Sequence, residues 1–159
     1  MLLLLADGTQ LPVAELPGEG PWTFLVLQPD PVPPGPAYLT RFGRVVVPDL
    51  RGRPGWGAAE GEPGFLDLVD DLDQVRTRAG LGRPLLAGLG ELAPLARRAA
   101  VDQPWAWRGL LVTPPADLDR LDLPAAVLEA DPAGAAEELV GRLGPGPGWG
   151  GIAPDAPPR

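Results

Sequence analysis

Apolar runs separated by turn residues occupy the first third of the chain. The first run ends at Ala6-Asp7-Gly8-Thr9, a combination typical of a hairpin turn. Pro12 in the second run favours an edge position in a sheet, because proline donates no backbone hydrogen bond. Residues 28–36 hold five prolines and are expected to form a loop, followed by a short helix at 37–42. The pattern predicts strands at 2–5, 11–16, 22–27 and 44–47.

Helical periodicity replaces this pattern after residue 64. Phe65, Leu68 and Leu72 recur at the spacing of one helix face, with aspartates early and arginines late, where they complement the helix dipole. Short apolar runs then alternate with further helical segments. The pattern predicts helices at 65–79, 91–101 and 133–143 and strands at 84–87, 108–112 and 124–128. Because buried strands that alternate with helices are typical of a parallel sheet covered on both faces, we predict an α/β fold with a mostly parallel open sheet.

The length of 159 residues suits one domain. We expect residues 1–144 to form it and residues 145–159 to be a Gly/Pro-rich tail, at best a poor final strand. The chain starts Met-Leu-Leu-Leu-Leu, but no cation precedes this run and Asp7 follows it, so no targeting signal is expected. No run approaches the roughly 20 apolar residues of a membrane span. A cytoplasmic protein without a membrane partner is the expectation.

Missing residue types exclude much of the chemistry that enzymes use. The chain contains no Cys, His, Ser, Asn or Lys, and all 13 basic residues are Arg. Without Cys there is no disulfide or zinc–thiolate site, without His no imidazole base or ligand, and without Lys no Schiff base. A net charge of -8 with scattered Arg opposes binding of nucleic acid, which requires a clustered basic face. We expect neither a cofactor nor a metal.

Several segments, taken in order, resemble the α/β-hydrolase family. Residues 44–52, Arg-Val-Val-Val-Pro-Asp-Leu-Arg-Gly, look like that family's fourth strand and the loop after it. The helix at 65–79 and residues 80–88 look like its next helix and its nucleophile strand. Residues 102–112 look like the exit from the elbow helix and the sixth strand, and residues 124–132 like the seventh strand and its acid-bearing loop. The resemblance covers roughly the whole predicted domain and implies an α/β-hydrolase-like core.

The same resemblance shows which catalytic groups are missing. The family holds its nucleophile in a G-x-S-x-G elbow, where a strand turns sharply into a helix and the next backbone N–H helps to bind an oxyanion. Here the elbow is Gly88-Leu89-Gly90-Glu91-Leu92, so Gly90 stands at the nucleophile position. Gln28-Pro29 stands where the family carries His-Gly, and Asp131 alone matches the triad acid. The last two predicted strands are separated by a short connection, so no lid is expected.

Gly90 and its neighbours each allow a functional and a structural interpretation. Gly90, expected at a strand-to-helix turn with positive φ, marks either a vacated site that still binds a ligand or the relief of backbone strain. Glu91 would act as a base or surrogate nucleophile, or would only interact favourably with the helix dipole. Asp131 would form an acid pair with Glu129, or would cap the helix that follows. We favour the structural interpretation for all of them.

Gln28 lies at the carboxyl end of a predicted strand, where open α/β sheets bind ligands. Its amide would hydrogen-bond a ligand carbonyl, although the proline-rich loop offers few N–H groups. Asp30 brings an acid into the former oxyanion region. Three further groups of residues are candidates for binding an anion, an aromatic ligand and a cation, respectively. For each of them we favour an ordinary role as solvated or core residues. They are Arg51 with Arg53; Trp56, Trp105, Trp107 and Trp149; and Asp67, Asp70, Asp71 and Asp73.

We therefore expect an α/β-hydrolase-like protein that has lost catalysis and acts as a small-ligand binder or an interaction module. A residual hydrolase for small ester-like substrates, in which Asp131 or Glu91 activates water, is the alternative. A third hypothesis is a purely structural partner, such as a homodimer that buries an exposed edge strand. The vestigial catalytic positions are Gly90 and Asp131, and the candidate ligand-binding residues are Gln28, Asp30, Gly90, Glu91 and Asp131.

Overall fold

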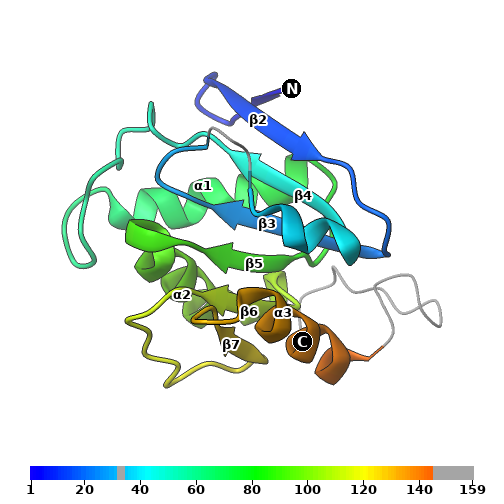
Figure 1. Ribbon diagram of the computed structural model, residues 1–159. Coiled ribbons are helices and arrows are strands. Elements are labelled where there is room, and N and C mark those ends of the chain that lie inside the picture. Colours follow the sequence, from blue (N-terminus) through cyan, green and yellow to red (C-terminus); the bar gives the residue numbers. More distant parts are fainter. Residues whose placement is uncertain (32–34, 145–159) are drawn as a thin grey trace.

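A computed structural model describes residues 1–31 and 35–144 of the chain (Figure 1). The predicted tail at 145–159 lies outside these residues. The strands are β1 (Leu2–Leu4), β2 (Gln10–Leu16), β3 (Trp22–Leu27), β4 (Gly43–Pro48), β5 (Leu85–Gly88), β6 (Gly109–Val112) and β7 (Ala125–Val127). The helices are α1 (Phe65–Arg78), α2 (Ala93–Asp102) and α3 (Pro132–Leu143), with short 3₁₀ segments η1 (Ala37–Arg41), η2 (Gly90–Leu92) and η3 (Pro104–Ala106). Each predicted strand is present, with ends that differ from the prediction by at most one residue.

The strands form one sheet in the order β1-β2-β4-β3-β5-β6-β7. β2 pairs antiparallel with β1 and β4, whereas β3, β4, β5, β6 and β7 are parallel to their neighbours within that group. Parallel neighbours need a crossover connection. The segments η1, α1 and α2 lie in the connections after β3, β4 and β5, and a stretch without a helix connects β6 to β7. The predicted mostly parallel open sheet is confirmed.

The sheet is buried between two apolar clusters, and helices cover both of its faces (Figure 1). Leu25 and Leu27 of β3 face the cluster that contains α1 and α2. Phe24 and Val26 of the same strand face the cluster that contains η1 and α3. Because both faces of β3 are buried, the strand is a continuous apolar run rather than an alternating one.

The predicted edge position of Pro12 is wrong, because β1 lies outside β2 in the sheet. The N–H of Val13 donates to the carbonyl of Met1, the residue before β1, at 2.8 Å. Since N–H directions alternate along a strand, the nitrogen of Pro12 faces away from β1. On that other side the carbonyl of Pro12 accepts a hydrogen bond from the N–H of Asp49 at 2.9 Å, one residue beyond the β2–β4 register that begins at Val13. Proline therefore costs the sheet one hydrogen bond at the end of this pairing.

None of the helices within the described residues is long and apolar enough to cross a membrane. The connection between β6 and β7, residues 113–124, contains turns and no helix. The absence of a lid from the protein stays a prediction.

Candidate functional site

The strand order reverses at β3, which lies between β4 and β5. After β3 the chain passes to η1 on one face of the sheet, and after β5 it passes to α2 on the opposite face. Connections that diverge in this way leave a crevice at the carboxyl edge of the sheet, the usual ligand site in open α/β folds. Residues 28–31 follow β3 and residues 89–92 follow β5 at this edge.

The elbow after β5 has the sharp geometry that the sequence predicts. The N–H of Leu89 still donates to the carbonyl of Leu27 at 2.8 Å, which continues the β3–β5 pairing. Leu89 is extended, and Gly90 then turns the chain with φ 56° directly into η2 and α2. The prediction of a strand-to-helix turn with positive φ at Gly90 is confirmed. The helix predicted at 91–101 is present as the 3₁₀ segment η2, which begins at Gly90, followed by α2, which ends at Asp102.

Thr113 occupies the elbow in a way that the sequence analysis did not anticipate. Its Oγ1 accepts a hydrogen bond from the N–H of Gly90 at 2.8 Å, and its own N–H donates to the carbonyl of Gly88 at 3.1 Å. A Cβ built on Gly90 would lie 3.5 Å from Cγ of Pro29, an ordinary contact. The position of Thr113 directly after the buried strand at 109–112 is the signal that could have found it. Its hydroxyl holds the elbow backbone.

Gly88 allows β5 to approach α2 closely. A Cβ at Gly88 would lie 2.5 Å from Cβ of Ala96 and 2.9 Å from Cα of Ala93. Such distances are well below ordinary van der Waals contact, so only glycine fits between the end of β5 and the first turns of α2. The first glycine of the elbow motif therefore has a packing role here that does not depend on catalysis.

Gln28 and Asp30 belong to the loop that leaves β3. Oε1 of Gln28 accepts a hydrogen bond from the N–H of Gly35 at 3.1 Å, and its Nε2 donates to the carbonyl of Asp30 at 2.7 Å. The Gln28 amide thus fastens the two ends of this loop. The carboxylate of Asp30 is exposed and lies 3.9 Å from the guanidinium of Arg51. Ligand binding by these two side chains stays a prediction.

Asp131 caps α3, as the structural interpretation predicts. Its Oδ1 accepts a hydrogen bond from the N–H of Gly134 at 3.0 Å. β7, which Asp131 follows, lies two strands from β5, a lateral separation of about 10 Å. General base catalysis needs hydrogen-bond distance or one bridging water, and no histidine exists to span this gap. Glu91 is exposed in η2.

Two adjoining clefts lie beside the elbow on the α2 side. The tryptophan cleft has a volume of about 550 Å³ and lies between the β4–α1 loop, the start of α1 and the start of α2. Its lining residues are Trp56, Gly57, Ala58, Ala59, Glu60, Phe65, Leu68, Glu91, Leu92, Pro94 and Leu95. Among the five candidate ligand-binding residues, Glu91 therefore lines a cleft of ligand size.

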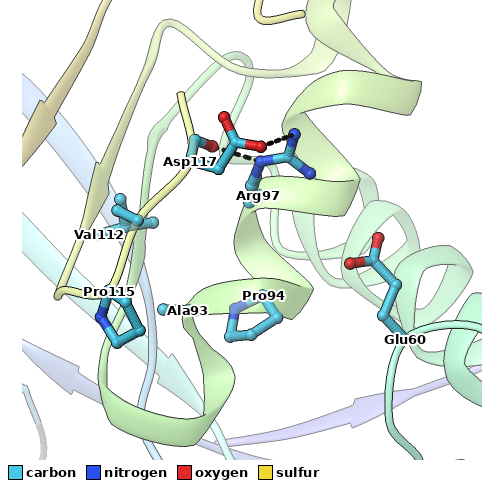
Figure 2. Close-up of a pocket in the computed structure, with 8 residues that line it drawn as sticks. Glu60, Ala93, Pro94, Arg97, Val112, Pro115 and Asp117 are labelled. Atoms are coloured by element: carbon cyan, nitrogen blue, oxygen red, sulfur yellow. Dashed lines mark hydrogen bonds and ion pairs between the residues drawn. The ribbon is translucent and has the colours of Figure 1, made fainter. Parts of the chain in front are cut away.

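The second, Arg97 cleft has a volume of about 230 Å³ and lies between α2 and the β6–β7 loop (Figure 2). Glu60 and Pro94 line both clefts, so the two share a border. Figure 2 shows Arg97 directed at Asp117, with which it forms an ion pair of 3.6 Å. Arg97 also donates hydrogen bonds to the main-chain carbonyls of Asp117 and Asp119, so its cation holds the loop.

The tryptophans divide between core and cleft. Trp107 is fully buried, and its indole N–H donates to the carbonyl of Ala99 at 3.3 Å. Trp105 is partly buried against the same cluster, as is Trp56, which also lines the tryptophan cleft. Trp149 lies outside the described residues. The three described tryptophans therefore do not form a common aromatic face. Of these, Trp56 is the one that a ligand in the tryptophan cleft could contact.

The solvated positions expected for Arg53 and Asp71 are wrong. The side chain of Arg53 is 7% exposed and that of Asp71 6%, and Nε of Arg53 lies 2.9 Å from Oδ2 of Asp71. Nη2 of Arg53 also binds Asp7 in the β1–β2 turn at 2.8 Å, which lowers the pKa of that carboxyl to about 2. Helical periodicity placed Asp71 beside the outward-facing Asp67 and Asp70, but the β4–α1 loop folds over it and brings its cation. These ion pairs anchor the loop that forms a wall of the tryptophan cleft.

The geometry defines an open, mostly parallel α/β protein with an elbow at its switch point, and solved structures assign the fold more closely. An α/β hydrolase from Sphaerobacter thermophilus matches 71% of this chain with 24% identity and a TM-score of 0.54. An α/β-hydrolase-fold protein from Burkholderia ambifaria matches 75% with 19% identity and a TM-score of 0.54. An epoxide hydrolase from Vigna radiata matches 71% with 22% identity and a TM-score of 0.52. The chain has the α/β-hydrolase fold.

The matched regions cover 44%, 45% and 38% of those three proteins, so the chain spans less than half of the length of each. No protein-family model matches the chain, and no curated protein sequence does. The similarity therefore supports the fold, and the function must be argued from the site.

Proposed function

We propose that this α/β-hydrolase-fold chain does not catalyse acyl transfer and instead binds a small ligand in the tryptophan cleft beside its elbow. The elbow carries this proposal. Its backbone keeps the sharp turn of a nucleophile elbow, but the residue at the turn is Gly90, and the Gly90 N–H is bound by Thr113. The chain contains no Ser, Cys or His, so neither the usual nucleophiles nor an imidazole base is available at the elbow.

Glu91 strengthens the argument against acyl transfer. The backbone N–H that follows the nucleophile position belongs to Glu91 and would be the oxyanion donor in an active enzyme. A carboxylate on the same residue would repel the negative charge that develops on the substrate oxygen. The elbow is therefore suited to building a fold and bordering a cleft, rather than to stabilising a tetrahedral intermediate.

Hydrolysis of a short-chain p-nitrophenyl ester tests this function. We expect the rate with the intact chain to equal that of a heat-denatured control, because Gly90 has no side chain and the chain contains no histidine. Water activation by a carboxylate in a well-built site would add ~10²–10⁴-fold, which the assay would detect. The variants Asp131→Ala and Glu91→Ala are assayed in parallel, with Glu138→Ala as a control that changes an exposed carboxylate on α3. Turnover above the denatured control that Asp131→Ala or Glu91→Ala abolishes, and Glu138→Ala leaves intact, would establish the residual hydrolase instead.

Self-association is a second candidate function, and the β1 strand favours it. β1 is an edge strand, and the side chains of Leu2 and Leu4 project from the same face with 59% and 58% of their surface exposed. Met1, next to them, is also exposed. An apolar edge strand is a template for pairing with a second chain, and we propose an antiparallel β1–β1 contact between two copies.

The variant Leu2→Lys/Leu4→Lys is expected to be monomeric at concentrations at which the unchanged chain sediments as a dimer. Lysines on an edge strand oppose strand pairing because they bring like charges together in the contact. Leu66→Lys, which changes an exposed leucine on α1, serves as the control and should remain dimeric. A chain that is monomeric at every concentration, or a double variant that still dimerises, would refute the β1 contact.

A further inference from the structure

The tryptophan cleft has an apolar floor. Phe65, Leu68 and Leu95 are almost completely buried where α1 and α2 meet beneath it. Trp56 and Leu92 are only partly buried and form its sides. A volume of about 550 Å³ with this lining suits the apolar body of a small organic molecule.

The loop that walls the cleft is held by its own hydrogen bonds. The N–H of Trp56 donates to the carbonyl of Arg53 at 3.0 Å, and that of Ala58 donates to the carbonyl of Gly55 at 3.1 Å. Oε1 of Glu62 accepts from the N–H of Ala59. Together with the buried Arg53 anchor, these contacts form the wall before any ligand arrives, so binding requires little ordering of this segment.

The charged side chains of the cleft are both carboxylates. Glu60 lies on the loop side and Glu91 on the elbow side, and the lining residues among the described part of the chain include no arginine. Arg98 reaches Glu60 at 3.4 Å but binds Asp102 more closely, at 2.9 Å. One guanidinium thus serves two carboxylates, and the rim of the cleft keeps an excess of negative charge.

We propose that the tryptophan cleft binds a small molecule with an apolar body and a cationic head group, an inference that rests on the proposed ligand-binding function. The body lies on Phe65 and Leu68, and the head lies between Glu60 and Glu91. Trp56 adds to the selection, because an aromatic face attracts cations. A neutral ligand gains only the apolar contacts, and an anion is repelled by both carboxylates.

Three probes with one body and different heads test this selection on the full chain: 3-phenylpropylammonium, 3-phenylpropanol and 3-phenylpropionate. Affinity is measured by calorimetry, and the site by the NMR shift of the Trp56 indole, assigned with Trp56→Phe. We expect the ammonium to bind about threefold to tenfold more tightly than the alcohol, since exposed charge pairs and cation–π contacts are individually weak. The carboxylate probe should bind least.

Glu60→Gln and Glu91→Gln separate the charge from the shape of the cleft. Each should weaken binding of the ammonium and leave binding of the alcohol unchanged, because glutamine keeps the volume and removes the charge. Glu138→Gln is the matched control, since this exposed glutamate lies on α3 at the opposite face of the sheet. It should change the affinity of none of the probes.

Three results would overturn the inference. If the alcohol binds at Trp56 as tightly as the ammonium, or if the preference survives both glutamine variants, the cleft binds ligands without selecting cations, and the ligand-binding function stands. If none of the three probes shifts the Trp56 indole, the cation site is refuted. The absence of acyl transfer is judged independently by the ester assay, which uses no cationic ligand.

Discussion

Replacing Arg53 by Met is expected to lower the free energy of unfolding by about 3 kcal/mol. The substitution removes the only cation that the described residues bring to the carboxylate of Asp71, which is 6% exposed and lies 2.9 Å from it. A buried carboxylate without a partner must either stay charged in a poorly solvated place or take up a proton, and both reduce stability. Urea unfolding followed by circular dichroism measures the change.

Arg51→Met is the matched control for this prediction. Arg51 lies two residues away in the same loop and also binds an aspartate through two nitrogens, Nε and Nη2 to Asp49. Its side chain is 48% exposed, so water replaces the lost interaction and stability should change little. The two variants therefore compare the loss of a buried Arg–Asp ion pair with the loss of an exposed one.

A second substitution shows whether the carboxylate of Asp71 causes the lower stability of Arg53→Met. Adding Asp71→Leu removes the uncompensated carboxylate, and the double variant should recover much of the lost stability, because apolar replacements of buried ion pairs are often tolerated. Equal loss in Arg53→Met and Arg51→Met, or no recovery in the double variant, would show that Asp71 is not the source of the effect.

The strands of the sheet could be predicted because the residues within each strand indicate how deeply it is buried. The run at 22–27 is apolar on both faces, which indicates a buried parallel strand whatever lies beside it. Pro12 was misjudged because an edge position depends on which strand lies outside it. β1 pairs with β2 through the predicted local hairpin, but the pairing of β2 with β4 on its other side joins segments far apart in the sequence.

Residues of the candidate site could be predicted only where the residue type itself favours the local backbone conformation. Gly90 could be placed at a tight turn because glycine tolerates positive φ, and Asp131 at a helix start because Asp-Pro is a common capping sequence. The partners of Thr113, Arg53 and Asp71 come from segments far apart in the chain. Periodicity places a side chain on a helix face, but it does not show which loop later covers that face.

Gly88→Ala is expected to destabilise the chain by about 1–3 kcal/mol, as overpacking in a close-packed interior does. The added methyl group would meet Cβ of Ala96 at 2.5 Å, Cα of Ala93 at 2.9 Å and the carbonyl oxygen of Leu92 at 3.0 Å. Two of these three atoms belong to the backbone, so rotation of a side chain cannot relieve the contact. α2 must move away from β5, and thermal unfolding should show the cost.

The shift of α2 should also reach the tryptophan cleft, because Leu92 and Leu95 line it. Gly88→Ala is therefore expected to weaken binding of 3-phenylpropanol as well as of the ammonium probe, unlike the glutamine variants. Gly141→Ala, in α3, is the control: a Cβ there meets no atom within 4 Å, and alanine should stabilise the helix by up to about 1 kcal/mol. A Gly88→Ala chain as stable as the unchanged one, with normal binding, would show that the elbow does not need its close approach to α2. If both stability and ligand binding are lost, Gly88 determines the shape of the cleft. That role would explain why the first glycine of the elbow is present in a chain that lacks the nucleophile.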